Sequence, residues 1–191
     1  MPEGIDNHRD FYRIECRAVV SCKLLGAALP RGQSPDSHFN ESPALALSRE
    51  LLRVDQENNP ALHAIGEKDR AVGSYLAVVN RKIDMLARYL LAQSAEATTG
   101  DEQSISLSEG GVAWHTAQTL PQGSFVALRL MLLPAWTAVT THAQIITSEH
   151  GGAEPLVTAS FENLDEAGRQ LIARHVMQVQ MAEQRRRAGR E

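Results

Sequence analysis

The 191-residue sequence has only two cysteines, few aromatic residues and no long apolar segment. Cys16 and Cys22 fall on the same face of one predicted strand, so we expect no local disulfide and two small buried side chains. The longest apolar run, 128–136, contains Arg129 and Pro134 and is far shorter than the roughly 20 residues of a membrane helix. The first residues are polar and acidic, unlike a secretory signal, so we expect a cytoplasmic protein without a membrane span.

A large excess of charge of one sign is lacking as well. The formal net charge of −4 argues against nucleic-acid binding through a broad basic surface. The seven histidines are scattered without metal-ligand spacing, so no metal or cofactor is expected. The sequence also has no GxSxG nucleophile motif, because Ser108 lies in SLSEGG. We therefore predict a protein that is not an enzyme. Its length and its 43% of hydrophobic residues predict a single domain over residues 1–191.

Strand signals occur at the beginning of the sequence and again in its second half. Residues 13–24 alternate between apolar and polar side chains, which is typical of a half-buried strand. The segments 104–116, 123–134, 135–152 and 154–164 are rich in β-forming residues and turns, which predicts a small antiparallel barrel or sandwich. Asn163, with Glu166 three residues later, resembles a capping box and predicts a C-terminal helix over 163–187. The basic tail that begins at Arg185 suits the end of this helix.

A helical insertion is predicted over residues 43–93. Ser42–Pro43 and Asn59–Pro60 are both helix-start signals. From residue 62 to residue 90, apolar side chains recur every three or four residues, with Asp69 as the exception, which predicts a helix about 45 Å long. This length favours a homo-oligomer, although packing within the same domain is the alternative. The predicted interface contains Leu62, Ile65, Val72, Leu76, Val79, Ile83, Leu86 and Leu90.

Two short motifs are candidates for binding an anionic ligand. The first is Arg9-Asp-Phe-Tyr-Arg13, directly before the first strand, although Arg13 and Arg17 have the same spacing. The second runs from Ser106 through Ser108 to Gly111. Arginine donates hydrogen bonds in pairs to phosphate or to the edge of guanine, and a serine-glycine turn offers hydroxyl and N–H groups. We prefer the first arginine pair, because the second lies within the alternating strand.

The order of these parts resembles the PilZ domain, and the helical insertion resembles its atypical subfamily, over about residues 9–184. The resemblance implies an α+β fold: a six-stranded antiparallel barrel, a helical insertion after the first strand, and a C-terminal helix. It also implies binding of cyclic di-GMP. Arg9 and Arg13 would fold over the ligand, while Ser106, Ser108 and Gly111 would line its pocket.

One position departs from this family pattern. Ser106 occupies the place of an aspartate or asparagine that reads a guanine edge. A lost hydrogen bond to a charged group costs about 1.5–3 kcal/mol. Two functions are therefore predicted. The first is a cyclic di-GMP receptor in which the ligand orders the arginine segment. The alternative is a nucleotide-independent adaptor that acts through the helical interface, for instance in pilus assembly or motility.

Overall fold

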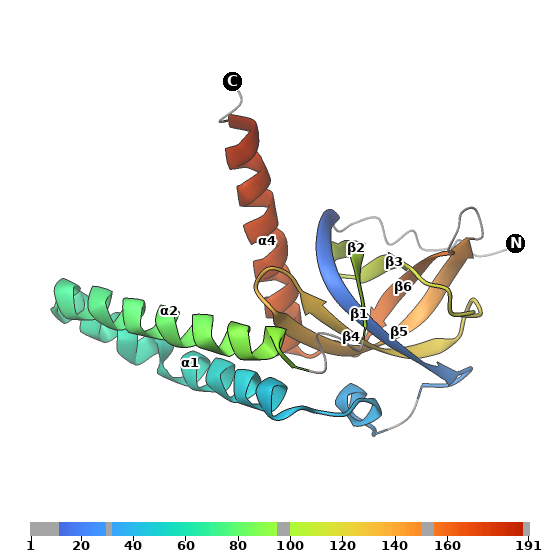
Figure 1. Ribbon diagram of the computed structural model, residues 1–191, viewed down its shortest axis with the longest axis horizontal. Coiled ribbons are helices and arrows are strands. Elements are labelled where there is room, and N and C mark those ends of the chain that lie inside the picture. Colours follow the sequence, from blue (N-terminus) through green and yellow to red (C-terminus); the bar gives the residue numbers. More distant parts are fainter. Residues whose placement is uncertain (1–11, 30–31, 95–99, 150–154, 189–191) are drawn as a thin grey trace, which may run out of the picture. The chain divides into compact units, whose positions relative to one another are not determined.

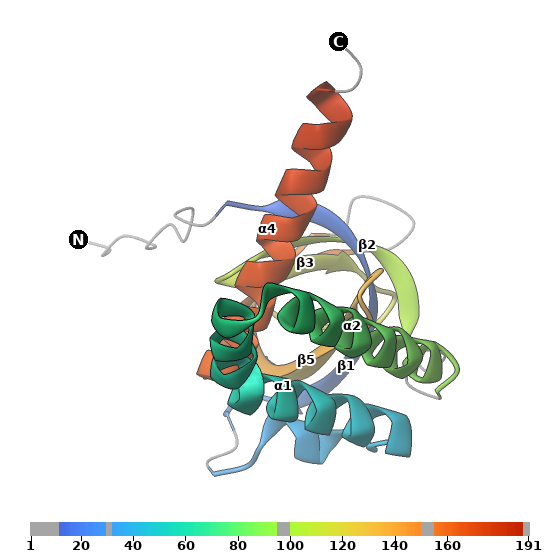
Figure 2. The same cartoon turned by 90° about the vertical axis from the view of Figure 1, so that its left-hand side faces the viewer.

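The computed structural model describes residues 12–29, 32–94, 100–149 and 155–188. The chain divides into two compact units: it leaves a barrel unit at Asn40, forms a helical unit, and returns to the barrel unit at Asp101. Figures 1 and 2 show both units in two orientations. We describe each unit separately, and the single domain over residues 1–191 stays a prediction.

The barrel unit contains six antiparallel strands, as predicted. They close in the order β1-β2-β3-β6-β5-β4, and β1 pairs with both β2 and β4. The ring is visible in Figure 2. The bounds are β1 Ile14–Gly26, β2 Asp101–Ser108, β3 Gly111–His115, β4 Phe125–Leu132, β5 Thr137–Glu149 and β6 Leu156–Glu162.

Alternate side chains along the strands fill the barrel interior. In β1, Ile14, Cys16, Ala18 and Val20 belong to the core, as their spacing predicted. The strand β4 differs, because the residues between its core positions are buried too. A strand that is buried on both faces carries an almost continuous apolar run. The outer face of β4 must therefore be covered by another part of the chain.

The helix α4 (Glu166–Ala188) contributes to the barrel core through Ile172 and Val176. It begins later than the sequence predicted. The Asp165 carboxylate accepts a hydrogen bond from the Gly168 N–H at 2.7 Å, so Asp165 caps the helix. Asn163 has a φ of 55°, a left-handed conformation that asparagine tolerates in turns. The predicted capping box at Asn163 is therefore wrong.

The helical unit is a hairpin of α1 (Pro43–Lys68) and α2 (Arg70–Ala92). Ser42 caps α1, as predicted, by accepting a hydrogen bond from the Leu45 N–H at 3.2 Å. Pro60 lies inside α1 and does not start a second helix. Among the described residues, no helix combines the length and apolar character that crossing a bilayer requires.

The predicted uninterrupted helix over residues 62–90 is wrong, because the chain reverses at Asp69. This residue has an extended backbone, and its carboxylate accepts hydrogen bonds from the Ala71 and Val72 N–H groups at 2.9 and 3.1 Å. Asp69 thus ends α1 and caps α2. It was the polar exception in the apolar repeat, which continues across the turn on a second helix.

A close contact between glycines joins the two helices of the hairpin. A Cβ atom added to Gly73 would lie 2.6 Å from the Gly66 Cα, whereas one added to Gly66 would meet nothing within 4 Å. We expect Gly73→Ala to destabilise the hairpin by about 1–3 kcal/mol because the helices must separate. Gly66→Ala, the matched control, should stabilise it by up to about 1 kcal/mol through helix propensity. Urea unfolding followed at 222 nm measures both effects, and equal midpoints for the two variants would contradict the close contact.

Candidate functional site

The predicted ligand residues that the structure describes lie at one end of the first three strands. Arg13 directly precedes β1 and is exposed. Ile14 pairs with Leu107 and Glu15 pairs with Ser106, so the register leads Arg13 toward the turn between β2 and β3. Arg9 lies outside the described residues. The binding roles of all five predicted residues stay predictions.

The two serines of the second motif differ in their availability. Ser106 is partly exposed on the outer face of β2. Ser108 is only 3% exposed, and its hydroxyl donates a hydrogen bond to the Gly111 carbonyl oxygen at 3.3 Å. The Ser108 hydroxyl therefore stabilises the turn between β2 and β3. A ligand at this site would find Ser106 more accessible.

Gly111 is required by the packing of the barrel. It pairs with Ser160 on β6, and an added Cβ atom would lie 2.3 Å from the Ala159 carbonyl oxygen. The resemblance to the PilZ domain implied that this glycine lines the ligand pocket. Its packing role could not be predicted, because β3 and β6 are distant in the sequence. The short SEGG turn before β3 carries no signal of that pairing.

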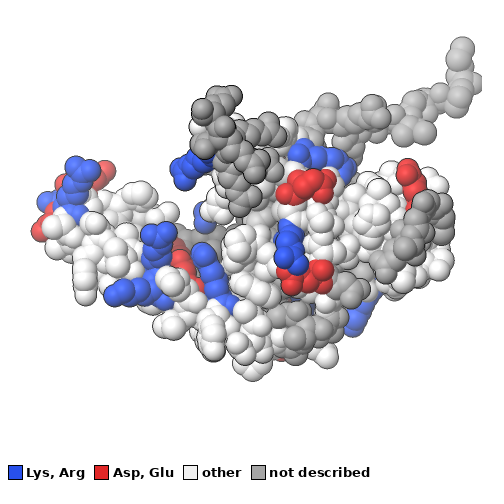
Figure 3. Space-filling view, turned by 45° about the horizontal axis from the view of Figure 1, so that its top comes forward, with Lys and Arg blue, Asp and Glu red and all other residues white. Residues whose placement is uncertain are grey.

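Charges of both signs lie beside Ser106. The Arg17 guanidinium forms an ion pair with the Glu102 carboxylate at 2.9 Å. Glu15, the β1 partner of Ser106, is exposed and accepts a hydrogen bond from the Ser104 hydroxyl at 3.5 Å. Figure 3 shows acidic and basic side chains interleaved over the barrel. A dianionic ligand at Ser106 would therefore meet a neighbouring carboxylate as well as Arg13.

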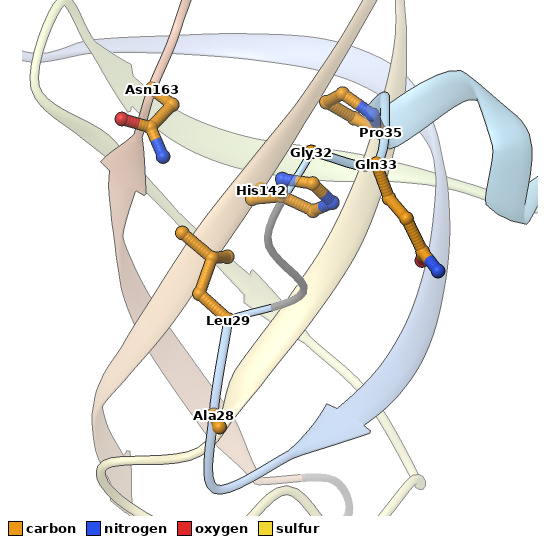
Figure 4. Close-up of a pocket in the computed structure, with 7 residues that line it drawn as sticks. All are labelled: Ala28, Leu29, Gly32, Gln33, Pro35, His142 and Asn163. Atoms are coloured by element: carbon orange, nitrogen blue, oxygen red, sulfur yellow. The ribbon is translucent and has the colours of Figure 1, made fainter.

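A separate cavity of about 660 Å³ lies toward the opposite end of β1 (Figure 4). Its walls come from the loop after β1, from β5 and from the residue after β6, and none of the predicted ligand residues belongs to them. Figure 4 shows the His142 ring beside the loop backbone at Gly32. The lining residues are Ala28, Leu29, Gly32, Gln33, Pro35, His142 and Asn163.

Other reactive groups in the described part of the chain are few. Burial raises the pKa of the Cys16 and Cys22 thiols to about 12, so both remain protonated near neutral pH. Both cysteines are free, and Cys16 is buried, as predicted, whereas Cys22 is only partly buried. Within the described residues, no three potential ligands among His, Cys, Asp and Glu gather into a metal site.

Comparison with known proteins identifies the architecture. No family profile and no curated protein matches the sequence. A solved structure of a Xanthomonas campestris protein, described as a tetrameric PilZ domain self-assembled through a helical bundle, aligns with a TM-score of 0.56. The two sequences are 16% identical, and the alignment covers 92% of this chain and 89% of that one. A closed six-stranded barrel with a helical insertion after β1 and a C-terminal helix is common to the prediction and the structure, and the chain has the fold of a PilZ domain.

Proposed function

We propose that this protein is a non-catalytic, oligomeric PilZ-type adaptor whose helical unit is the self-association interface. The apolar surface of the hairpin is the observation that carries this proposal. Of the 17 exposed large hydrophobic side chains among the described residues, 11 lie in the helical unit. They are Leu47, Val54, Ile65, Val72, Tyr75, Val78, Ile83, Met85, Leu86, Tyr89 and Leu90.

The exposed apolar side chains of α2 gather on one side of the helix, together with the exposed Lys82. Gly73 packs against Gly66 of α1, and Leu91, about five turns later on the same side of α2, is buried as well. At 3.6 residues per turn, the exposed apolar side chains of α2, together with the partly buried Val79, fall within an arc of about 160° on the other side of the helix. The arc includes Leu86 and Tyr75, which are 65% and 68% exposed. An arc of this width exceeds the apolar stripe of about 100° that a surface helix usually buries against its own domain, and exposed apolar patches mark interaction sites.

Five of the eight predicted interface residues are exposed and available to a partner: Ile65, Val72, Ile83, Leu86 and Leu90. The other three, Leu62, Leu76 and Val79, are partly buried within the hairpin unit. Tyr75, Val78, Met85 and Tyr89 widen the surface beyond the predicted repeat.

A second copy of the chain is the partner that we propose for this surface. An apolar arc that contains a single charged residue of α2, Lys82, can pair with itself across a two-fold axis. The Xanthomonas campestris protein, which is described as assembling through a helical bundle, supports the same arrangement by analogy of fold. In this chain the bundle would be built from hairpins contributed by each copy.

Light scattering after size-exclusion chromatography tests the proposal. We expect the full chain at micromolar concentration to have a mass of at least twice that of one chain, which is 20.9 kDa. A dilution series should show dissociation only well below that concentration. A mass of one chain throughout the series would contradict self-association and leave the adaptor proposal without its interface.

Cyclic di-GMP binding is a second candidate function, favoured by the register that brings Arg13 toward the turn carrying Ser106. In this proposal the ligand orders the arginine segment that precedes β1. Glu15 beside Ser106 and the absence of an acid or amide at position 106 both oppose tight binding. The geometry therefore supports this candidate less strongly than it supports the oligomeric adaptor.

Calorimetric titration with cyclic di-GMP tests the second candidate. For a receptor we expect micromolar binding or tighter, reduced about 10- to 150-fold by Arg13→Ala, because a charged hydrogen bond contributes about 1.5–3 kcal/mol. Arg17→Ala is the matched control: its guanidinium pairs with Glu102, so affinity should be retained if Arg9 and Arg13 form the clamp. Flat titrations for both the native protein and Ser106→Asp would contradict nucleotide binding at this site.

A further inference from the structure

A short segment covers the outer face of β4 and β5. This segment, Gly32–Phe39, is called the strap here, and it contains the one-turn helix η1 (Pro35–His38). The Ser37 and Phe39 N–H groups donate hydrogen bonds within it to Ser34 and Asp36, each at 3.0 Å. The Phe39 ring of the strap lies over Arg129, so the strap accounts for the burial of this outward residue of β4. It is also the last segment of the barrel unit before the helical unit begins at Asn40.

Two histidines meet where the strap contacts β5. The rings of His38 in η1 and His142 in β5 pack edge to face, with their centroids 5.5 Å apart. His142 is 3% exposed, and the Nε2 atoms of both rings are buried without a hydrogen-bond partner. A proton added to either Nε2 would create a charged donor that has no acceptor, which is unfavourable in a buried contact.

The groups around this pair include two cations. The Arg129 guanidinium of β4 lies 4.6 Å from the Phe39 ring centre, and the Lys23 ammonium of β1 lies 5.5 Å from it. Arg129 is itself only 3% exposed. On this outer face, two further positive charges would therefore be added beside existing ones.

Two acids lie near the histidines. Glu162 of β6 is the register partner of His142. Asp36 lies in the strap, two residues before His38. The pKa of His142 is nevertheless lowered, first because burial disfavours the imidazolium and second because of the neighbouring His38 charge. The neutral form is thus the one that suits the docked strap.

We propose that the strap is a pH-sensitive latch, in which protonation of the His38–His142 pair releases Gly32–Phe39 from the outer face of β4 and β5. The cavity beside the His142 ring gives the loop room to rearrange (Figure 4). Release would lengthen the tether between the barrel unit and the helical unit. This inference is independent of the proposed adaptor function.

The direction of the pH effect follows from proton binding. A histidine whose pKa is lowered in the docked state binds fewer protons there than in the released state. Docking is therefore fully favoured above the ordinary histidine pKa of about 6.5 and weakens as the pH falls below it. One such histidine lowers the docking equilibrium constant by at most about tenfold per pH unit.

Hydrogen exchange of the full chain, read by mass spectrometry and corrected for the intrinsic pH dependence of exchange, tests the latch. Between pH 7.5 and 5.5 we expect protection of strap peptides to fall by up to about tenfold, the limit for one histidine whose pKa is lowered in the docked state. Peptides from β4 and β6 should keep their protection, which distinguishes strap release from unfolding of the barrel. Unchanged protection of the strap peptides over this pH range would overturn the proposal.

Two variants assign the effect to the histidine pair. His142→Phe retains an aromatic ring that cannot be protonated, so it should keep the strap protected at pH 5.5. His38→Phe, at a partly exposed position, provides the same test if His142→Phe folds poorly. His63→Phe, an exposed position on α1, is the control and should leave the pH response intact. The same loss of strap protection in His142→Phe and His38→Phe as in the native chain would also overturn the proposal.

Discussion

Replacing Leu86 with aspartate is expected to dissociate the oligomer. Leu86 lies near the middle of the apolar arc of α2 and is 65% exposed in the single chain. Burying a leucine side chain contributes about 1.5–3 kcal/mol, and burying an unpaired carboxylate at the same place is strongly unfavourable. We expect the dissociation constant to rise at least about 100-fold, which corresponds to ~2.7 kcal/mol. Light scattering over a dilution series should then give the mass of one chain at micromolar concentration.

Ser74→Asp provides the matched control for this change. Ser74 is exposed on the same helix, on the polar side that also carries Arg70, Arg81 and Arg88. The substitution introduces the same charge without touching the apolar arc, so the mass should remain that of the native protein. Far-ultraviolet circular dichroism should show that both variants keep the hairpin. A native mass for Leu86→Asp would place the interface elsewhere.

Replacing Gly111 with alanine is expected to cause the largest loss of barrel stability among the changes considered. The new methyl group would lie 2.3 Å from the Ala159 carbonyl oxygen, so β3 and β6 would have to separate. Forcing extra volume into a packed region costs about 1–3 kcal/mol, and a backbone obstacle favours the upper end of that range. For a chain of this size, 3 kcal/mol corresponds to a decrease in Tm of ~6–12 °C. Thermal unfolding followed in the near ultraviolet, where the buried Trp114 reports on the barrel, measures it.

Ser106→Ala is the control that separates a packing role of Gly111 from a ligand-binding role. Ser106 lies in the same motif but is partly exposed, so its replacement should change stability by no more than about 0.5 kcal/mol. If Gly111→Ala were as stable as the native protein and lost only nucleotide binding, the packing argument would fail. Similar unfolding midpoints for the two variants would lead to the same conclusion.

Local patterns predicted the elements of this fold better than they predicted its long-range contacts. The alternation of β1 is a property of adjacent residues, and it placed Ile14, Cys16 and Ala18 in the core before any partner strand was known. The reversal at Asp69 was missed because the apolar repeat remains in phase across the turn. Its signal was the aspartate itself, a residue that favours helix N-caps.

The strap and the packing role of Gly111 depend on neighbours that are far away in the sequence. His38 and His142 are separated by more than half of the chain, so no spacing rule joins them. Arg129 gave the one local signal. It is a charged residue inside an apolar run, and it is only 3% exposed. A buried arginine on an outer face indicates a covering segment, but the sequence does not say which segment that is.

The closed ring of strands also limits how this protein can recognise others. Within the described residues, each strand of the barrel pairs with a neighbour on both sides over at least part of its length, so no strand presents a fully open edge to which an extended peptide could add as a further strand. Strand addition along a whole edge of the barrel is thereby disfavoured. Its partners must instead be selected by side chains on the outer face or on the helices, where single substitutions can change specificity without disturbing the ring.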